Sequence, residues 1–263
     1  SKKNITVVVI LYNTPLSKIV NLKQFINFNL IILEQGKVAI LKKNIQKILG
    51  FKFRYYYSKK NLGLTKGINF LIKKTKTKYC VITEPDIYIE PKSIINLSKV
   101  INLNKKYLLV GPRYNKKNLF KKNMITKNID LSCVLFETKK IIKFNFYDED
   151  FFFFWSDIDL VKRINNSNFK MVVAKNSFAK HNMSNSSKNS INNNFRRDKS
   201  YKYGELIFDA KYNKLRFLKV FRQLIKSFFN IFFYIITFQS KKIVKNLGYL
   251  FGIFEFLIFY LKS

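Results

Sequence analysis

Short apolar runs alternate with helical stretches along much of this chain, and this alternation constrains the fold more than any other feature. Residues 5–11 are apolar or β-branched throughout, as in a parallel strand buried on both faces. Comparable patterns predict further strands at 30–33, 53–57, 79–83, 107–111, 131–136 and 171–174, and helices at 16–28, 64–74 and up to 164. This order predicts βαβ units, and so an α/β fold with a mixed, mostly parallel sheet flanked by helices.

Polar residues follow several of these expected strands. Tyr12 and Asn13 end the first, Glu34 ends the second, and Glu84-Pro85-Asp86 follows the strand at 79–83. Ligands of such sheets bind beyond the carboxyl ends of the strands. We therefore expect these side chains to gather at one edge of the sheet.

The length and charge of the chain limit the number of domains and the kinds of partner that we expect. Its 263 residues allow a catalytic domain at 1–212 and a tail at 213–263. The formal net charge of +35 comes mostly from Lys, in a chain rich in residues with A/T-rich codons, and only seven arginines occur. Proteins that read nucleic-acid sequence depend on Arg, so we expect no nucleic-acid partner. Cys80 and Cys133 lie in apolar stretches and are expected to be buried free thiols, which fits a reducing compartment.

The tail has a different pattern from the rest of the chain. Polar residues at 216, 219, 223, 226 and 230 share one helical face, and large apolar residues occupy the other. A basic face opposite an aromatic face suits an anionic membrane surface, but an amphipathic helix packed on the catalytic domain has the same pattern. The stretch 247–261 contains Glu255 and falls short of the ~20 apolar residues of a spanning helix, so it is expected to be interfacial or re-entrant. Residues 182–194, rich in Asn and Ser, predict a mobile loop.

Four signals occur in a fixed order. They are the strand ending in Tyr12-Asn13, the segment 61–69 (NLGLTKGIN), Glu84-Pro85-Asp86, and the segment 151–163 followed by His181. In this order the chain resembles the inverting, family-2 glycosyltransferases of the GT-A fold, most closely the bacterial rhamnosyltransferase-type members. The resemblance covers roughly residues 5–220.

The resemblance implies a metal site. The family has an Asp-x-Asp motif where this chain has Glu84-Pro85-Asp86, and a metal-binding His often follows the last core strand, as His181 does here. Asp86 and His181 are then the expected ligands of a divalent cation, Mg²⁺ or Mn²⁺, and Glu84 is expected near the donor. Without the resemblance, the pattern indicates two solvated acids in a turn, and His181 is expected to be a surface residue.

The resemblance also implies a catalytic base. Asp157 falls where the family has a carboxylate that takes the proton of the acceptor hydroxyl, with Asp159 and Arg163 in supporting roles. Arg163 follows Asp159 at the i+4 position and can pair with it on a helix. Acids at a helix N-terminus, favoured by its dipole, are the alternative explanation of this pattern.

The expected donor site takes residues from the first three signals. The resemblance places the nucleobase and ribose beside Tyr12, Asn13 and Glu34, and the diphosphate beside the segment 61–69. In that segment the candidates are Asn61, Gly63, Lys66 and Gly67. Close packing of a helix on the sheet would also require glycines there.

The sequence thus predicts a metal-dependent, inverting glycosyltransferase of hexosyl or rhamnosyl type. It would move a sugar from a nucleoside-diphosphate sugar to a glycan or lipid-linked glycan in cell-surface polysaccharide biosynthesis, as a peripheral protein on the cytoplasmic face of the membrane. Two rivals remain. A nucleotidyltransferase would carry a glycine-rich basic loop after the first strand, where residues 13–16 read NTPL. A non-catalytic protein that binds lipid or nucleic acid would leave Asp86, Asp157 and His181 unexplained.

Overall fold

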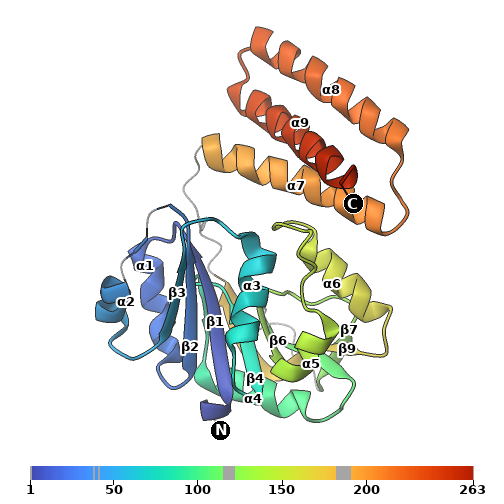
Figure 1. Ribbon diagram of the computed structural model, residues 1–263. Helices are drawn as coiled ribbons and strands as arrows, with labels where there is room; N and C mark the ends of the chain where they lie inside the picture. The colour runs from blue at the N-terminus through green and yellow to red at the C-terminus, as the bar shows by residue number, and fades with distance from the viewer. Residues whose placement is uncertain (1, 38, 41, 115–121, 182–190, 263) are drawn as a thin grey trace. The chain divides into compact units, whose positions relative to one another are not determined.

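The computed structural model describes residues 2–37, 39–40, 42–114, 122–181 and 191–262. The chain forms two compact units (Figure 1). The first comprises Ser1–Tyr147 and Leu160–Ser186, and the second comprises Asp148–Asp159 and Ser187–Ser263. The helix at Ile191–Lys211 therefore groups with the C-terminal helices. The expected division into a catalytic domain at 1–212 and a tail at 213–263 stays a prediction.

A mixed sheet forms the centre of the first unit. Among the described residues its strands are β1 (Ile5–Tyr12), β2 (Asn29–Gln35), β3 (Arg54–Ser58), β4 (Tyr79–Thr83), β5 (Ile87–Ile89), β6 (Tyr107–Arg113), β7 (Met124–Thr126), β8 (Cys133–Glu137) and β9 (Lys170–His181). Their order is β3-β2-β1-β4-β8-β6-β9-β5, and β7 pairs with β9. Strands β1 to β4 are parallel neighbours, whereas β8 runs antiparallel to both β4 and β6. The mostly parallel α/β fold expected from the sequence is confirmed.

Burial explains why the N-terminal strands have almost no polar residues. The side chains of Val7, Val8 and Val9 on β1 are all 0% exposed, because β1 lies inside the sheet and both of its faces are covered. Cys80 and Cys133 are free and buried in the neighbouring strands, as expected.

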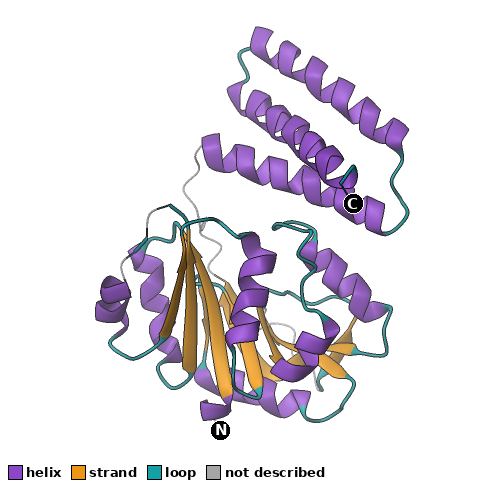
Figure 2. Cartoon of the chain, viewed as in Figure 1, coloured by secondary structure: helices purple, strands orange, loops and turns teal. Residues whose placement is uncertain are grey.

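Helices cover both faces of this sheet (Figure 2). The described helices of this part of the chain are η1 (Lys2–Asn4), α1 (Leu16–Ile19), η2 (Val20–Phe25), α2 (Lys42–Leu49), α3 (Gly63–Lys74), α4 (Pro91–Ile101), α5 (Thr138–Phe144) and α6 (Ser156–Asn165). The first four residues of α6 belong to the second unit. Helix α3 packs on β1 and β2, and α4 packs on β6, β8 and β9.

Three sequence expectations differ from the structure. The helix expected at 16–28 is a short α-helix followed by the 3₁₀-helix η2, and the last strand extends well beyond residue 174 to end at His181. Within the expected loop at 182–194, residues 182–190 lie outside the described residues. Residues 191–194 are helical, so the loop prediction is wrong there, because they form the first turn of a long helix.

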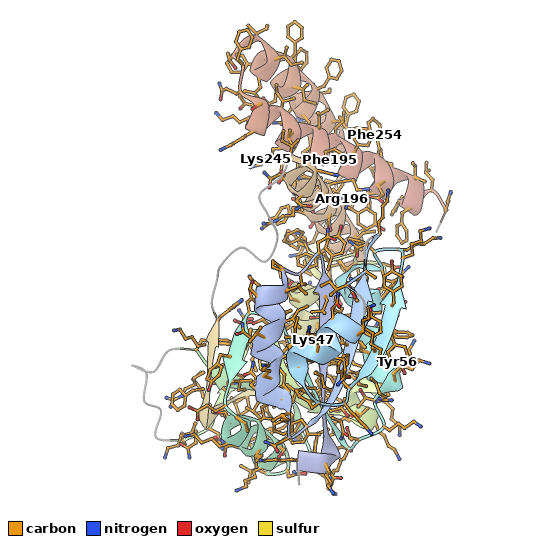
Figure 3. The ribbon with its side chains drawn as sticks, turned by 90° about the vertical axis from the view of Figure 1, so that its left-hand side faces the viewer. Lys47, Tyr56, Phe195, Arg196, Lys245 and Phe254 are labelled. Carbon is orange, nitrogen blue, oxygen red and sulfur yellow. The ribbon has the colours of Figure 1, made fainter. Side chains whose placement is uncertain are left out.

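The second unit is a set of three long helices, α7 (Ile191–Lys211), α8 (Phe217–Ile236) and α9 (Ser240–Tyr260). Its core contains Phe151, Leu206, Val220, Ile253 and Phe256. Figure 3 labels Phe195 and Arg196 on α7, and Lys245 and Phe254 on α9. Among the described helices, α9 is long and apolar enough to cross a membrane, by length and composition only. The expectation that this part of the chain is too short to span does not hold for the whole helix, which begins before residue 247.

Glycines allow α7 and α9 to approach closely. A Cβ atom added at Gly252 would lie 2.5 Å from the carbonyl oxygen of Lys199, and one at Gly248 would lie 3.0 Å from that of Phe195. These glycines stand one helical turn apart on α9. Side chains at these two positions would meet backbone atoms of α7, so the close packing of the two helices requires glycine there.

Candidate functional site

Glu84, Asp86 and His181 form a cluster of metal-ligand type. Their nearest ligand atoms all lie within 4.8 Å of one another, and they are the one such group found among the described residues. His181 Nε2 lies 3.6 Å from Asp86 Oδ1 and 3.8 Å from Glu84 Oε2. Ligands about 2.1 Å from a cation stand ~3.0 Å apart when adjacent and ~4.2 Å apart when opposite in octahedral geometry. The cluster therefore has the dimensions of a divalent-cation site.

Strand pairing brings these three residues together. Glu84 and Asp86 lie in the turn between β4 and β5, and the antiparallel pairing of β5 with β9 sets Ile87 opposite His181. His181 is thus the last residue of β9, placed by the ladder beside the acidic turn. The extension of β9 past residue 174 is what delivers it there.

The acidic turn concentrates negative charge in a partly buried place. Asp86 is 4% exposed, and its Oδ1 receives no hydrogen bond from the described residues. Burial of the carboxyl group, followed by the neighbouring carboxylate of Asp86, raises the pKa of Glu84 to about 7. Buried carboxylates without donors are costly, and a cation would relieve that cost. Two carboxylates and an imidazole fit a divalent cation, and the imidazole suits Mn²⁺ better than Mg²⁺.

A segment that sequence reasoning missed holds the turn from the side. Lys18 Nζ lies 3.5 Å from Asp86 Oδ2, and Asn21 Nδ2 donates to the Pro85 carbonyl at 3.1 Å. The Gln24 amide donates to the Ile87 carbonyl at 2.9 Å and accepts from the Ile89 N–H at 2.7 Å. Lys18, Asn21 and Gln24 are spaced by three residues, which is the period of a 3₁₀-helix. Helix η2 therefore places Asn21 and Gln24 on the same side as Lys18. That spacing was the available signal.

The expected donor-site residues lie at the same edge of the parallel strands. Tyr12 ends β1, and Asn13 follows with a positive φ of 48°. Both stand close to Gly36, where an added Cβ would lie 3.5 Å from Asn13 Oδ1 and from the Tyr12 ring. The gathering of polar residues at the carboxyl edge is therefore observed for these strands.

Glu34 is buried and engaged by its own chain. It is 3% exposed, and its carboxylate accepts hydrogen bonds from the Ile40 N–H and, at 2.6 Å, from the Tyr55 hydroxyl. Burial and this carboxylate raise the pKa of Tyr55. Glu34 therefore anchors the segment around residue 40.

The segment 61–69 forms the start of α3. Asn61 Oδ1 accepts from the Gly63 N–H at 3.0 Å, and Gly63 has a positive φ of 78°. Gly67 is buried, and an added Cβ would lie 2.7 Å from Ile10 Cδ1, so this glycine serves the packing of α3 on the sheet. Lys66 is exposed.

Asp157 and Asp159 stand on opposite sides of the first turn of α6. Asp157 is exposed, whereas Asp159 is 0% exposed. Asp159 Oδ1 lies 2.7 Å from Lys211 Nζ and accepts from the Tyr212 hydroxyl at 2.9 Å. Asp157 belongs to the second unit and the metal-type cluster to the first. The helical geometry leaves Asp157 available to a ligand and makes Asp159 part of a buried polar contact.

The residues that flank the two acids have structural contacts. Arg163 donates to the carbonyls of Asn145 at 2.7 Å and Phe146 at 2.6 Å, just after α5, and its pairing with Asp159 stays a prediction. Trp155 has a φ of 72° immediately before α6, and its ring packs against Phe208 at a centroid distance of 5.3 Å. An aromatic residue rarely adopts a positive φ, so the entry to α6 is strained.

Comparison with known proteins identifies the family. The family model "Glycosyl transferase family 2" matches residues 6–164. No curated protein sequence matches the chain significantly. Among solved structures, the chain is similar to the mannosyltransferase PcManGT from Pyrobaculum calidifontis in complex with GDP-Man and Mn²⁺, with a TM-score of 0.59 and 10% identity. It is also similar to S. aureus TarS, with a TM-score of 0.55 and 10% identity.

The alignments cover 80% and 92% of this chain, but only 65% of the mannosyltransferase and 55% of TarS. At this identity the two structures show the fold alone. The family model, however, matches more than half of the chain. This protein therefore belongs to glycosyl transferase family 2, and its mixed sheet is the GT-A fold expected from the sequence.

Proposed function

We propose that this protein moves a sugar of hexosyl or rhamnosyl type from a nucleoside-diphosphate sugar to a hydroxyl of a glycan or lipid-linked glycan, with inversion, in cell-surface polysaccharide biosynthesis. The observation that carries the proposal is the Glu84–Asp86–His181 cluster at the carboxyl edge of the sheet, with its unsatisfied buried oxygen on Asp86. Such an edge is where α/β sheets bind nucleotides. The mannosyltransferase of similar fold is in complex with GDP-Man and Mn²⁺, which supports a donor and a cation of these classes.

In the proposed donor complex, Asp86 and His181 hold Mg²⁺ or Mn²⁺, and Glu84 holds the cation or the donor ribose. The bound cation supplies neutralisation of the charge that develops on the diphosphate. Tyr12 and Asn13 meet the nucleoside, while Glu34 fixes the segment around Ile40 beside them.

Asp157 acts as the base in the proposed transfer. Its exposed carboxylate takes the proton of the acceptor hydroxyl as that oxygen bonds to the anomeric carbon. The bond from that carbon to the diphosphate oxygen breaks in the same step, and its electron pair leaves with the nucleoside diphosphate. A single displacement of this kind inverts the configuration.

Two further considerations concern the acceptor and the location of the transfer. A carrier lipid would bring the acceptor to the membrane, and the free thiols of Cys80 and Cys133 suit the reducing cytoplasmic side. We propose the cytoplasmic face of the membrane as the site of transfer.

A thermal-shift screen with turnover assays tests the donor site. UDP, GDP and dTDP are each added with and without Mn²⁺, and the matching nucleotide sugars are then assayed for transfer. A ligand at 100 times its Kd stabilises a protein by about 2.7 kcal/mol, which corresponds to a rise of about 5–10 °C in Tm for a chain of this size. We expect one nucleoside diphosphate to give such a rise, and only with Mn²⁺ present.

Asp86→Asn and Glu90→Gln form a matched pair of carboxylate-to-amide variants. Glu90 lies just after β5, and its carboxylate pairs with Lys92 at 2.9 Å. Asp86→Asn should lose the Mn²⁺-dependent rise, and Glu90→Gln should keep it. Equal rises in both variants would remove Asp86 from the metal site, and no rise with any nucleoside diphosphate plus Mn²⁺ would refute the donor site. Formation of a nucleotide sugar from a nucleoside triphosphate and a sugar phosphate would instead identify a nucleotidyltransferase.

A further inference from the structure

Helix α8 exposes an unusually apolar face. Six of its phenylalanines are between 55% and 67% exposed: Phe217, Phe221, Phe228, Phe229, Phe232 and Phe233. Leu218, at 62%, and Ile225, at 41%, lie on the same face. Soluble proteins rarely leave a continuous apolar surface of this kind to water.

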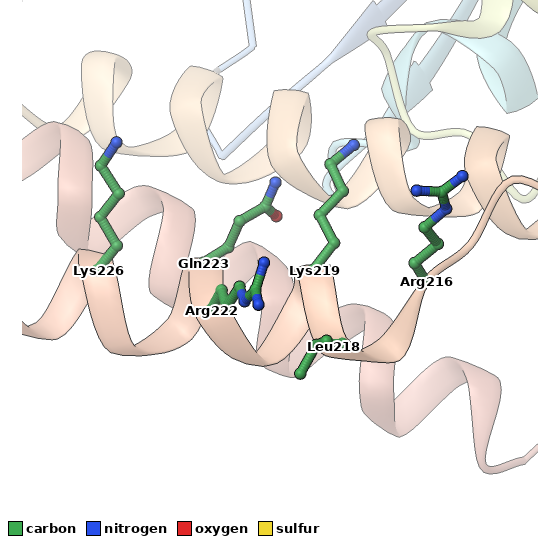
Figure 4. A pocket seen from close by; sticks show the side chains of 6 residues that line it. All are labelled: Arg216, Leu218, Lys219, Arg222, Gln223 and Lys226. Atoms are coloured by element: carbon green, nitrogen blue, oxygen red, sulfur yellow. The ribbon is translucent and has the colours of Figure 1, made fainter.

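A different strip of α8 packs inside the second unit, where Val220 and Ser227 are buried and Leu224 packs against the core. Figure 4 shows Arg216, Lys219, Gln223 and Lys226 projecting towards α7, whereas Leu218 projects the other way. Lys219 Nζ lies 3.5 Å from Asp209 Oδ2 on α7, and Asn230 donates to Asn246 of α9 at 3.2 Å. The large apolar residues of α8 therefore lie mostly outside its packed strip, whereas a surface helix of a soluble protein buries its apolar face.

Cations flank the apolar face. A pocket of about 350 Å³ is lined by Arg216, Arg222 and Lys226, together with Leu218, Lys219 and Gln223. From residue 216 to residue 262 the chain carries eight Lys and Arg but one acid, Glu255, which pairs with Lys199 at 3.0 Å. The region is thus complementary to an anionic surface and not to a second copy of itself.

We propose that the outward face of α8 docks the protein on an anionic lipid bilayer. The phenylalanines enter the boundary of the acyl chains, and the flanking Arg and Lys side chains meet the lipid phosphates. Arg222 and Lys226 fall within the length of α8, which places this helix in the plane of the interface and not across the membrane. The proposal does not depend on the chemistry of the first unit, because it concerns the second unit alone.

Vesicle flotation of the full chain tests the apolar face. The probes are vesicles of phosphatidylglycerol and phosphatidylcholine in equal parts, and vesicles of phosphatidylcholine alone, without any sugar nucleotide. The variant Leu218→Ser/Ile225→Ser has a matched control in Leu103→Ser/Ile125→Ser, which replaces a Leu and an Ile that are 68% and 57% exposed in the first unit. We expect the α8 variant to lower the partition coefficient at least about tenfold, and the control to leave it unchanged.

A second pair of variants tests the charge. Each Lys or Arg near an anionic surface contributes about fivefold to binding, so Arg222→Gln/Lys226→Gln should lower the partition coefficient about 25-fold. Lys99→Gln/Lys105→Gln removes the same charge from exposed positions of the first unit and should have little effect.

Three outcomes would overturn the proposal. Equal binding to both vesicle types would show that anionic lipid is not required. Equal losses in the α8 variants and their controls would show that binding depends on the overall charge of the chain and not on α8. A dimer in sedimentation equilibrium without vesicles, dissociated by Leu218→Ser/Ile225→Ser, would make this face a contact between two copies. Trp155 fluorescence checks that each α8 variant keeps the fold of the second unit, because that ring packs on α7.

Discussion

Replacing Lys211 with methionine removes the cation that faces the buried carboxylate of Asp159. Asp159 is 0% exposed and lies 2.7 Å from Lys211 Nζ, whereas the Lys211 side chain is 30% exposed and also contacts Asp148. Removing one partner of a buried ion pair costs about 3–5 kcal/mol. The reverse change, Asp159→Asn, leaves Lys211 with solvent and Asp148, and should cost about 1.5–3 kcal/mol, the value of a hydrogen bond to a charged group.

Urea unfolding followed by tryptophan fluorescence measures both costs. Trp155 is the only tryptophan, and it packs in the second unit beside this ion pair. Lys214→Met, at an exposed position three residues further along the chain, is the matched control and should change the free energy of unfolding by less than about 0.5 kcal/mol. The reasoning fails if Lys211→Met costs no more than this control, or if Asp159→Asn costs more than Lys211→Met.

Three further predictions address the metal, the base and the helix packing. Because the pKa of Glu84 is raised to about 7, its carboxyl group is largely protonated below pH 7, and a cation must displace that proton. Mn²⁺ affinity measured by calorimetry should therefore fall by up to about a further tenfold per pH unit below 7 on account of Glu84, and Glu84→Gln should make the dependence shallower, leaving the proton competition at His181; a slope unchanged in the variant contradicts the prediction. In the metal-free protein the same shift favours the protonated form, so stability should decline as pH rises from about 4.5 to 7 and not the reverse. Asp157→Asn should abolish transfer in a donor-turnover assay but keep nucleotide binding, and loss of binding in the folded variant would take Asp157 out of the base role. Gly252→Ala should destabilise the second unit by about 1–3 kcal/mol, despite the helix preference of alanine, because its Cβ would lie 2.5 Å from the Lys199 carbonyl. Chemical denaturation compares the free energy of unfolding of Gly252→Ala with that of Phe254→Ala, at an exposed position on α9. Equal values for the two variants would show that α7 and α9 accommodate the added Cβ without cost.

The parallel half of the fold was predictable from the sequence because its strands are buried on both faces. Residues 5–11 and 79–83 are apolar for that reason, and their neighbours at the carboxyl edge were found by position alone. The end of β9 was not predictable in this way. Its Ser177 is polar yet 0% exposed, and it stays in the strand because it donates to the Ser93 carbonyl and accepts from Asn96, both on α4.

The metal-type cluster was predictable in part. Asp86 and His181 were expected from the order of motifs, and the structure adds Glu84 at the same place. Lys18 and Gln24 were missed because Lys18 lies on the short helix α1 and Gln24 on the 3₁₀-helix η2, whereas the pattern at 16–28 indicated one continuous α-helix. Small departures in helix type therefore hide residues that contact the site.

The hydrogen bonds of Gln24 have a consequence for solubility. Strand β5 is the last in the sheet order, and an unpaired edge strand is a template on which another chain can add a strand and aggregate. The Gln24 amide occupies the carbonyl of Ile87 and the N–H of Ile89, two main-chain groups that such a strand would use. One side chain thus both holds the acidic turn in place and blocks the β5 edge of the sheet against edge-to-edge association.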